Sequence, residues 1–206
     1  MKVLMLNGSP REDGNTAVAL AEMEKVFAEN GVDCETVLVG GKDIRGCIAC
    51  RKCGETNRCV FDNDEVNELA DKLKEADGLV VGTPVYFAQT NATLTALLQR
   101  MFFSIHTDLR DKVGASVVVA RRGGSSSTYD NLNKFFGVAG MPIATSQYWN
   151  MVYGRDIGDA PEDAEGLQTM RTLANNMVFL MKSIALGKEK FGLPEKEEEI
   201  STNFVR

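Results

Sequence analysis

The chain has 206 residues, of which 44% are hydrophobic and 25% charged, so it is long enough for one well-buried core and has the composition of an ordinary globular protein. Its formal net charge is −6 and its lysines and arginines form no run, which argues against a nucleic-acid partner. The longest apolar stretches are strand-sized and the first residues lack a signal-peptide pattern, so we expect a cytoplasmic protein that does not enter a membrane.

Short apolar runs alternate with helix-spaced patterns along the chain. Runs such as residues 79–81 and 117–119 are apolar at successive positions, as in strands covered on both faces. The alternation predicts an α/β fold with a flavodoxin-like, doubly wound parallel sheet of five strands in the order 2-1-3-4-5. We expect one domain over residues 1–187, with a cysteine-rich loop at 46–62 after the second strand, and a tail over 188–206. The expected strands are residues 3–6, 34–39, 78–85, 114–120 and 141–145, and the expected helices are 16–29, 65–76, 92–105, 127–138 and 164 to about 186.

The first expected strand is followed by N-G-S-P-R-E-D-G-N-T over residues 7–16. Glycines let a backbone turn sharply, and the start of the next helix offers free N–H groups and a positive dipole end, which together favour an anion. Ser9, Asn15 and Thr16 can donate hydrogen bonds to a phosphate, and Arg11 adds positive charge. An ordinary turn with a helix cap explains the same residues, and position alone leaves both interpretations open.

Four of the five cysteines follow the second expected strand. Three of them are spaced by two residues and the fourth lies five residues further on, so their thiolates can face one small volume. This spacing suits a cubane iron–sulfur cluster, whose irons each need one thiolate, better than zinc, which usually takes two distant C-x2-C pairs. Zinc, and thiols or a disulfide without metal, remain alternatives. The four cysteines are Cys47, Cys50, Cys53 and Cys59, whereas Cys34 is expected to be a small core residue.

Two further loops follow strands three and four. Tyr86 and Phe87 can lie against a flat aromatic ligand, and Arg122, Gly123 and Gly124 offer positive charge and backbone N–H groups to the polar edge of a flavin. Each loop alone is explained as well by packing or by a solvated turn. Together with the phosphate loop, they fall where one mononucleotide would bind in such a sheet.

These segments resemble the NADPH-dependent FMN reductase family and, more narrowly, the iron–sulfur flavoproteins of the flavodoxin-like fold. The resemblance rests on G-S-P-R-x-x-G-N-T at residues 8–16, T-P-V-Y-F at 83–87, R-x-G-G at 121–124 and the cysteine spacing, and it covers roughly residues 1–185. Many relatives carry Lys and Asp-Arg near positions 95 to 100, where this chain has Thr95, Gln99 and Arg100. The resemblance implies that Ser9, Arg11, Asn15 and Thr16 hold the FMN phosphate, that Pro84, Val85, Tyr86 and Phe87 line the ribityl chain and the ring, that Arg122, Gly123 and Gly124 contact the polar edge, and that Cys47, Cys50, Cys53 and Cys59 bind a [4Fe–4S] cluster.

The function that the resemblance implies is an FMN-dependent electron-transfer flavoprotein, coupling FMN to a [4Fe–4S] cluster in a homodimer or homotetramer. Its redox partner would be ferredoxin, NAD(P)H or a small oxidant. The alternative is an NAD(P)H-dependent FMN or quinone reductase without a cluster, and a zinc-stabilised binding module is a third hypothesis. Electron transfer needs no general base, so we expect His106 to be a surface residue, whereas Trp149 can either pack or cover a flavin.

Overall fold

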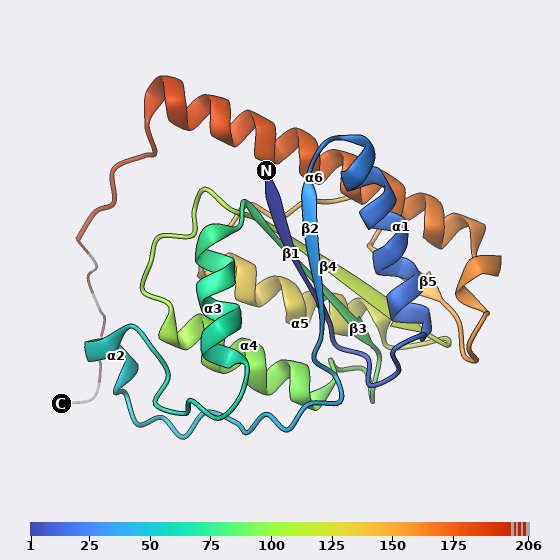
Figure 1. Cartoon of the computed structure of the whole chain (residues 1–206), viewed down its shortest axis with the longest axis horizontal. Coiled ribbons are helices and arrows are strands. Elements are labelled where there is room, and N and C mark those ends of the chain that lie inside the picture. The colour runs from blue at the N-terminus through green and yellow to red at the C-terminus, as the bar shows by residue number, and fades with distance from the viewer. Residues whose placement is uncertain (199, 201, 203, 205–206) are drawn as a thin grey trace.

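The protein is described here by a computed structural model that covers residues 1–198, 200, 202 and 204. Five parallel strands form one sheet in the order β2-β1-β3-β4-β5, which confirms the predicted flavodoxin-like topology (Figure 1). The strand order reverses between β1 and β3, and in such sheets ligands bind at the carboxyl ends of the strands beside that point. The strands are β1 (Lys2–Asn7), β2 (Asp33–Leu38), β3 (Gly78–Pro84), β4 (Val113–Ala120) and β5 (Met151–Tyr153).

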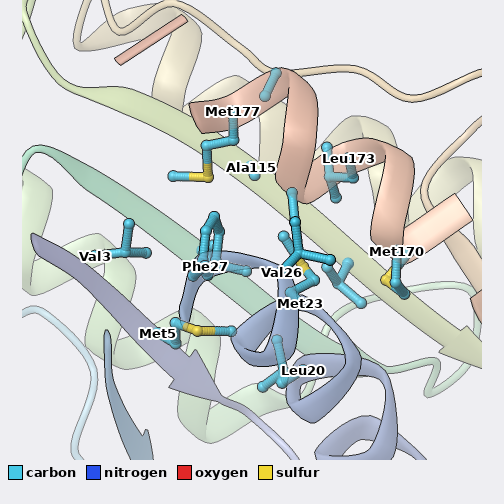
Figure 2. Packing of buried hydrophobic residues seen from close by; sticks show 14 of the residues in the cluster. Val3, Met5, Leu20, Met23, Val26, Phe27, Ala115, Met170, Leu173 and Met177 are labelled. Carbon is cyan, nitrogen blue, oxygen red and sulfur yellow. The ribbon is translucent and has the colours of Figure 1, made fainter. Parts of the chain in front are cut away.

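Helices cover both faces of the sheet, because alternate strand side chains face opposite layers. On one face Val3 and Met5 of β1 pack with Phe27 of α1 and Met177 of α6, as Figure 2 shows. Complete burial of an aromatic side chain such as Phe27 contributes about 1.5–3 kcal/mol. The other face is covered by α3, α4 and α5. The helices are α1 (Asn15–Glu29), α2 (Cys53–Thr56), α3 (Val66–Glu75), α4 (Ala92–Ser104), α5 (Ser125–Val138) and α6 (Ala164–Phe191), with a 3-10 turn η1 (Ala160–Glu162).

The fifth strand is not where the sequence predicted it. Residues 141–145 do lie beside the start of β4, where Gly114 donates to the carbonyl of Pro142 and accepts from the N–H of Ala144, both at 2.8 Å. They form only an isolated bridge between Gly114 and Ile143, since Pro142 has no N–H to extend the ladder. The chain then leaves the sheet and returns as β5, three residues long, against the end of β4.

The last helix also differs in length from the prediction. α6 continues to Phe191, beyond the expected end near residue 186. Residues 199, 201, 203 and 205–206 of the expected tail lie outside the described residues. Among the described residues, no helix combines the length and the apolar character needed to cross a membrane.

Candidate functional site

A hollow of about 170 Å3 opens at the carboxyl ends of the strands, where the loops after β1, β3, β4 and β5 meet. The structure therefore brings together side chains that are far apart in sequence, as the parallel topology predicts. We call it the phosphate-loop hollow. Its lining residues are Ser9, Arg11, Gly14, Asn15, Thr16, Pro84, Val85, Tyr86, Val119, Arg121, Gly154 and Arg155.

The loop after β1 is held by its own hydrogen bonds. The N–H of Ser9 donates to Asn7 Oδ1 at 3.0 Å, and the N–H of Arg11 donates to Ser9 Oγ at 3.1 Å. Gly14 stands at the N-cap of α1 and has no side chain with which to cap it. Because the first N–H groups of a helix lack intrahelical partners, the start of α1 presents donors and a positive dipole end at the hollow.

Asn15 fastens this loop to the segment after β5. Its Nδ2 donates to the carbonyl of Asp156 at 3.0 Å, and its Oδ1 accepts from the buried N–H of Ala160 at 3.1 Å. Gly154 allows the contact, since a Cβ there would lie 2.6 Å from Asn15 Nδ2. The side chain predicted to bind phosphate is thus engaged within the chain, and its position at the start of α1 leaves its backbone N–H at the hollow.

Three arginines surround the hollow, and two of them were not among the predicted site residues. Arg11 comes from the loop after β1, Arg121 directly follows β4, and Arg155 comes from the loop after β5. The sequence shows Arg121 next to Arg122, and Arg122 was the predicted site residue. Which of the two side chains reaches the hollow depends on the direction of the backbone where β4 ends, and the structure places Arg121 there. Nothing in the sequence indicated that Arg155 lies at the site, because the strand before it was predicted at residues 141–145.

Four predicted flavin residues are not among those lining the hollow: Phe87, Arg122, Gly123 and Gly124. Phe87 is fully exposed, in a two-residue hairpin turn where the N–H groups of Tyr86 and Gln89 each donate to the other's carbonyl at 2.9 Å. Phe87 and Ala88 both have positive φ, which costs energy in residues other than glycine. Gly124, at φ 90°, lies against Ala88, and a Cβ there would come within 2.8 Å of the Ala88 Cα. The hairpin and the start of α5 therefore form one packed wall beside the hollow.

The four clustered cysteines line a second, smaller hollow, of about 20 Å3, which we call the cysteine hollow. Ala49 and Arg51, which lie between cysteines, have positive φ and turn the chain sharply, and α2 then begins at Cys53. Cys47 and Cys50 are exposed, whereas Cys53 is buried and Cys59 partly buried. The last turn of α4 closes the hollow with Arg100, Phe103 and Ser104.

Cys53 and Cys59 are the two cysteines held most firmly by their surroundings. The thiol of Cys53 contacts the carbonyl of Phe103 at 3.5 Å, and burial, together with the neighbouring cysteines, raises the pKa of that thiol. The backbone N–H of Cys59 donates to Asn67 Oδ1 at 2.9 Å, and its carbonyl accepts from Asn67 Nδ2 at 3.0 Å. Within the described residues, no group of three or more His, Cys, Asp or Glu side chains is arranged to hold a single metal ion.

The remaining candidates of the sequence lie apart from both hollows. His106 is exposed just beyond the end of α4, as expected. Trp149 is half-exposed and packs against Tyr148, with ring centroids 5.0 Å apart. Cys34 is partly buried on β2, and burial raises the pKa of its thiol to about 11.

Comparison with known sequences places the chain among flavoproteins. Residues 1–156 match the family described as NADPH-dependent FMN reductase. An iron–sulfur flavoprotein of Methanocaldococcus jannaschii is 35% identical over 192 residues, which cover 89% of this chain and 99% of that protein. An iron–sulfur flavoprotein of Methanosarcina thermophila is 29% identical over 196 residues, covering 92% of this chain and 100% of the relative.

Solved structures share the fold at low sequence identity. RosB, solved with a bound 8-demethyl-8-formylriboflavin-5′-phosphate intermediate, superposes with a TM-score of 0.72 at 17% identity, covering 100% of this chain and 94% of that one. A flavodoxin from the domain Archaea gives a TM-score of 0.59 at 14% identity, over 90% of this chain and 99% of that one. These likenesses confirm the flavodoxin-like architecture.

Proposed function

This chain belongs to the NADPH-dependent FMN reductase family and is an FMN-dependent oxidoreductase, and we propose that it couples its FMN to a [4Fe–4S] cluster in electron transfer. The observation that carries the proposal is the convergence of four cysteines on one hollow, separate from the phosphate-loop hollow. When bound, FMN exchanges electrons in pairs or singly and the cluster exchanges them singly, so the pair links two-electron and one-electron chemistry.

The phosphate-loop hollow fits the phosphate end of FMN. Ser9 and Thr16, both buried, would bind the phosphate together with the free N–H groups at the start of α1, and Arg11 would balance its charge. Arg121 and Arg155 add positive charge at the same hollow, and Pro84, Val85 and Tyr86 would line the remainder of the cofactor.

The cysteine hollow fits a cubane cluster by the chemistry of its donors. The four thiolates of a cubane each bind a different iron, so they need not converge on one ion, as the ligands of zinc must. Cys47, Cys50, Cys53 and Cys59 all line the hollow; Cys53 contacts the carbonyl of Phe103 on α4, and Cys59 is hydrogen-bonded to Asn67 on α3. The exposed pair would adjust around the cluster.

The distance between the two hollows supports an oligomer. The hairpin beside the phosphate-loop hollow leads into α4, and the last turn of α4 lines the cysteine hollow. A helix of 13 residues is roughly 20 Å long, and the two hollows of one chain lie towards opposite ends of it. Figure 1 shows α2 at the left of the molecule and the strand ends towards the right. Because electron transfer slows steeply with distance, a homodimer or homotetramer that brings the cluster of one copy near the flavin of another would perform the coupling.

The test is anaerobic purification followed by FMN, iron and sulfide analysis. FMN with about four irons and four sulfides per chain is the expected result for one cubane. Ferredoxin, NAD(P)H and small oxidants are then compared as redox partners of the loaded protein. FMN without iron after anaerobic reconstitution would contradict the coupling and favour the second candidate.

The second candidate is an NAD(P)H-dependent FMN or quinone reductase without a cluster, and the description of the matched family favours it. In that case NAD(P)H oxidation by the FMN-loaded protein would be unaffected when Cys47 and Cys50 are both replaced by serine. The same replacement should abolish cluster binding under the first proposal.

A further inference from the structure

Arg100 is a buried cation beside the cysteine hollow. Its side chain is 1% exposed, on the last turns of α4, and it forms an ion pair with Asp64, whose side chain is 4% exposed. Burial of such a pair carries a desolvation cost that only good geometry and further hydrogen bonds can offset. The contacts of the guanidinium therefore indicate what it does.

Every donor of this guanidinium has a partner in the segment that contains the cysteines. The two terminal nitrogens bind both carboxylate oxygens of Asp64 and also donate to the carbonyls of Arg45 and Phe61, at 3.3 Å each. The fifth N–H, on Nε, donates to the sulfur of Cys59 at 3.3 Å. An arginine has five N–H donors, so none is left over.

The hydrogen bond to the sulfur of Cys59 indicates that Arg100 does more than hold the cysteine segment in place. Asn67 already binds the N–H and the carbonyl of Cys59, so the backbone of Cys59 has a support besides the arginine. What the arginine adds is a charged hydrogen-bond donor to the sulfur of Cys59. Hydrogen bonds to cluster sulfurs are one of the factors that set the reduction potential of an iron–sulfur centre.

We propose that Arg100 is a positioning residue that aims the Cys59 sulfur into the cysteine hollow and raises the reduction potential of the cluster bound there. The inference rests on the proposed function. A donated N–H stabilises the thiolate most when the cluster carries its extra electron, because the sulfur is then more negative. Loss of the donor therefore disfavours reduction.

The test replaces the ion pair without changing the net charge. Arg100→Gln with Asp64→Asn removes the charged donor and its buried counter-ion together, so no unpaired charge is left inside. The matched control is Arg58→Gln with Asp71→Asn, which removes an ion pair of 2.7 Å between half-exposed side chains in the same region. Each anaerobically reconstituted protein is analysed for FMN, iron and sulfide, and the midpoint potential of its cluster is measured by a redox titration followed by electron paramagnetic resonance.

We expect the Arg100/Asp64 variant to keep its FMN and its cluster, with the equilibrium constant for one-electron reduction about tenfold lower, which is about 59 mV. The Arg58/Asp71 control should match the wild type. A fully loaded variant with the wild-type potential would overturn the role of Arg100 alone, whereas wild-type protein with FMN and no iron would overturn it together with the proposed function.

A second variant decides the case in which the double replacement fails to fold or loses its cluster. Arg100→Lys keeps a charge for Asp64 and lacks the Nε–H that meets Cys59. A lowered potential in this variant would support the proposal, and an unchanged potential or loss of FMN together with the cluster would count against it.

Discussion

Asn15 provides the sharpest test of how the phosphate-loop hollow is built. Replacement by alanine removes its hydrogen bonds to Asp156 and Ala160. The carbonyl of Asp156 belongs to an exposed residue and can bind water, but the N–H of Ala160 is buried, and an unsatisfied buried donor costs about 1–3 kcal/mol. We expect Asn15→Ala to lower the free energy of unfolding by about 2 kcal/mol, which for a chain of this size lowers Tm by about 4–8 °C.

The Asn15→Asp variant distinguishes the structural role of the Asn15 hydrogen bonds from the effect of charge on FMN binding. The aspartate keeps an oxygen for the N–H of Ala160, so the loss of stability should be smaller than for alanine. It also places a negative charge where the FMN phosphate would bind, so the affinity for FMN should fall further than for alanine. Thermal unfolding of the FMN-free protein and fluorescence titration with FMN should therefore rank the two variants in opposite orders.

Gly154→Ala is the independent control, because its Cβ would displace the Asn15 side chain. It should reproduce the loss of stability of Asn15→Ala without any change at residue 15. If Asn15→Ala melts with the wild type, or if both assays rank the variants alike, then the hydrogen bonds to residues 156 and 160 do not support the hollow.

Three further outcomes are expected. Gly124→Ala should weaken FMN binding by pushing the neighbouring hairpin aside, whereas Gly137→Ala, near the end of α5 and with open space around its Cβ, should bind as the wild type in the same titration. Iodoacetamide at pH 8 should modify Cys34 last among the accessible thiols, since a pKa of about 11 leaves about one thiolate in a thousand; mass spectrometry of timed samples would show early labelling if this is wrong. Hydrogen bonds from Lys25 and from an arginine of α6 lower the pKa of Glu22, so its stabilisation should be complete above the usual value of 4.5 and lost as the pH falls through the lowered one. Urea unfolding from pH 7 to 3 should show the wild type losing its advantage over Glu22→Gln, and parallel curves would refute the assignment.

The sheet was predictable wherever a strand is buried on both faces. The apolar runs of β1, β3 and β4 stand out in the sequence because helices cover both sides of them. β5 was not predicted because it has only three residues. The longer apolar run before it, 141–145, predicts the fifth strand instead, although it contains Pro142. A strand that pairs only with the last three residues of its neighbour is too short to show a recognisable hydrophobic pattern in the sequence.

The site was predictable as a meeting of loops and unpredictable in its individual contacts. Parallel strands bring their carboxyl ends together, so Ser9, Thr16 and Tyr86 had to lie near one another. The side-chain amide of Asn15 forms hydrogen bonds with residues that lie 141 and 145 positions further along the chain, and no local sequence motif indicates these partners. Arg155 was missed because its position follows from β5, whose place the sequence did not reveal.

The buried ion pair beside the cysteines bears on whether the chain binds a cluster. If the cysteines had no ligand, the segment from residue 45 to 64 would need only to pack against α4, and apolar side chains of similar volume commonly replace a buried ion pair without loss of stability. Here Arg100 and Asp64 are buried together, and the one guanidinium N–H that does not meet an oxygen meets the sulfur of Cys59. A charged donor to a cysteine sulfur has a use when that sulfur carries electron density that changes with redox state, as a cluster ligand does. The contacts of Arg100 thus agree with the proposed coupling of flavin and cluster, and the potential of the Arg100/Asp64 variant tests both together.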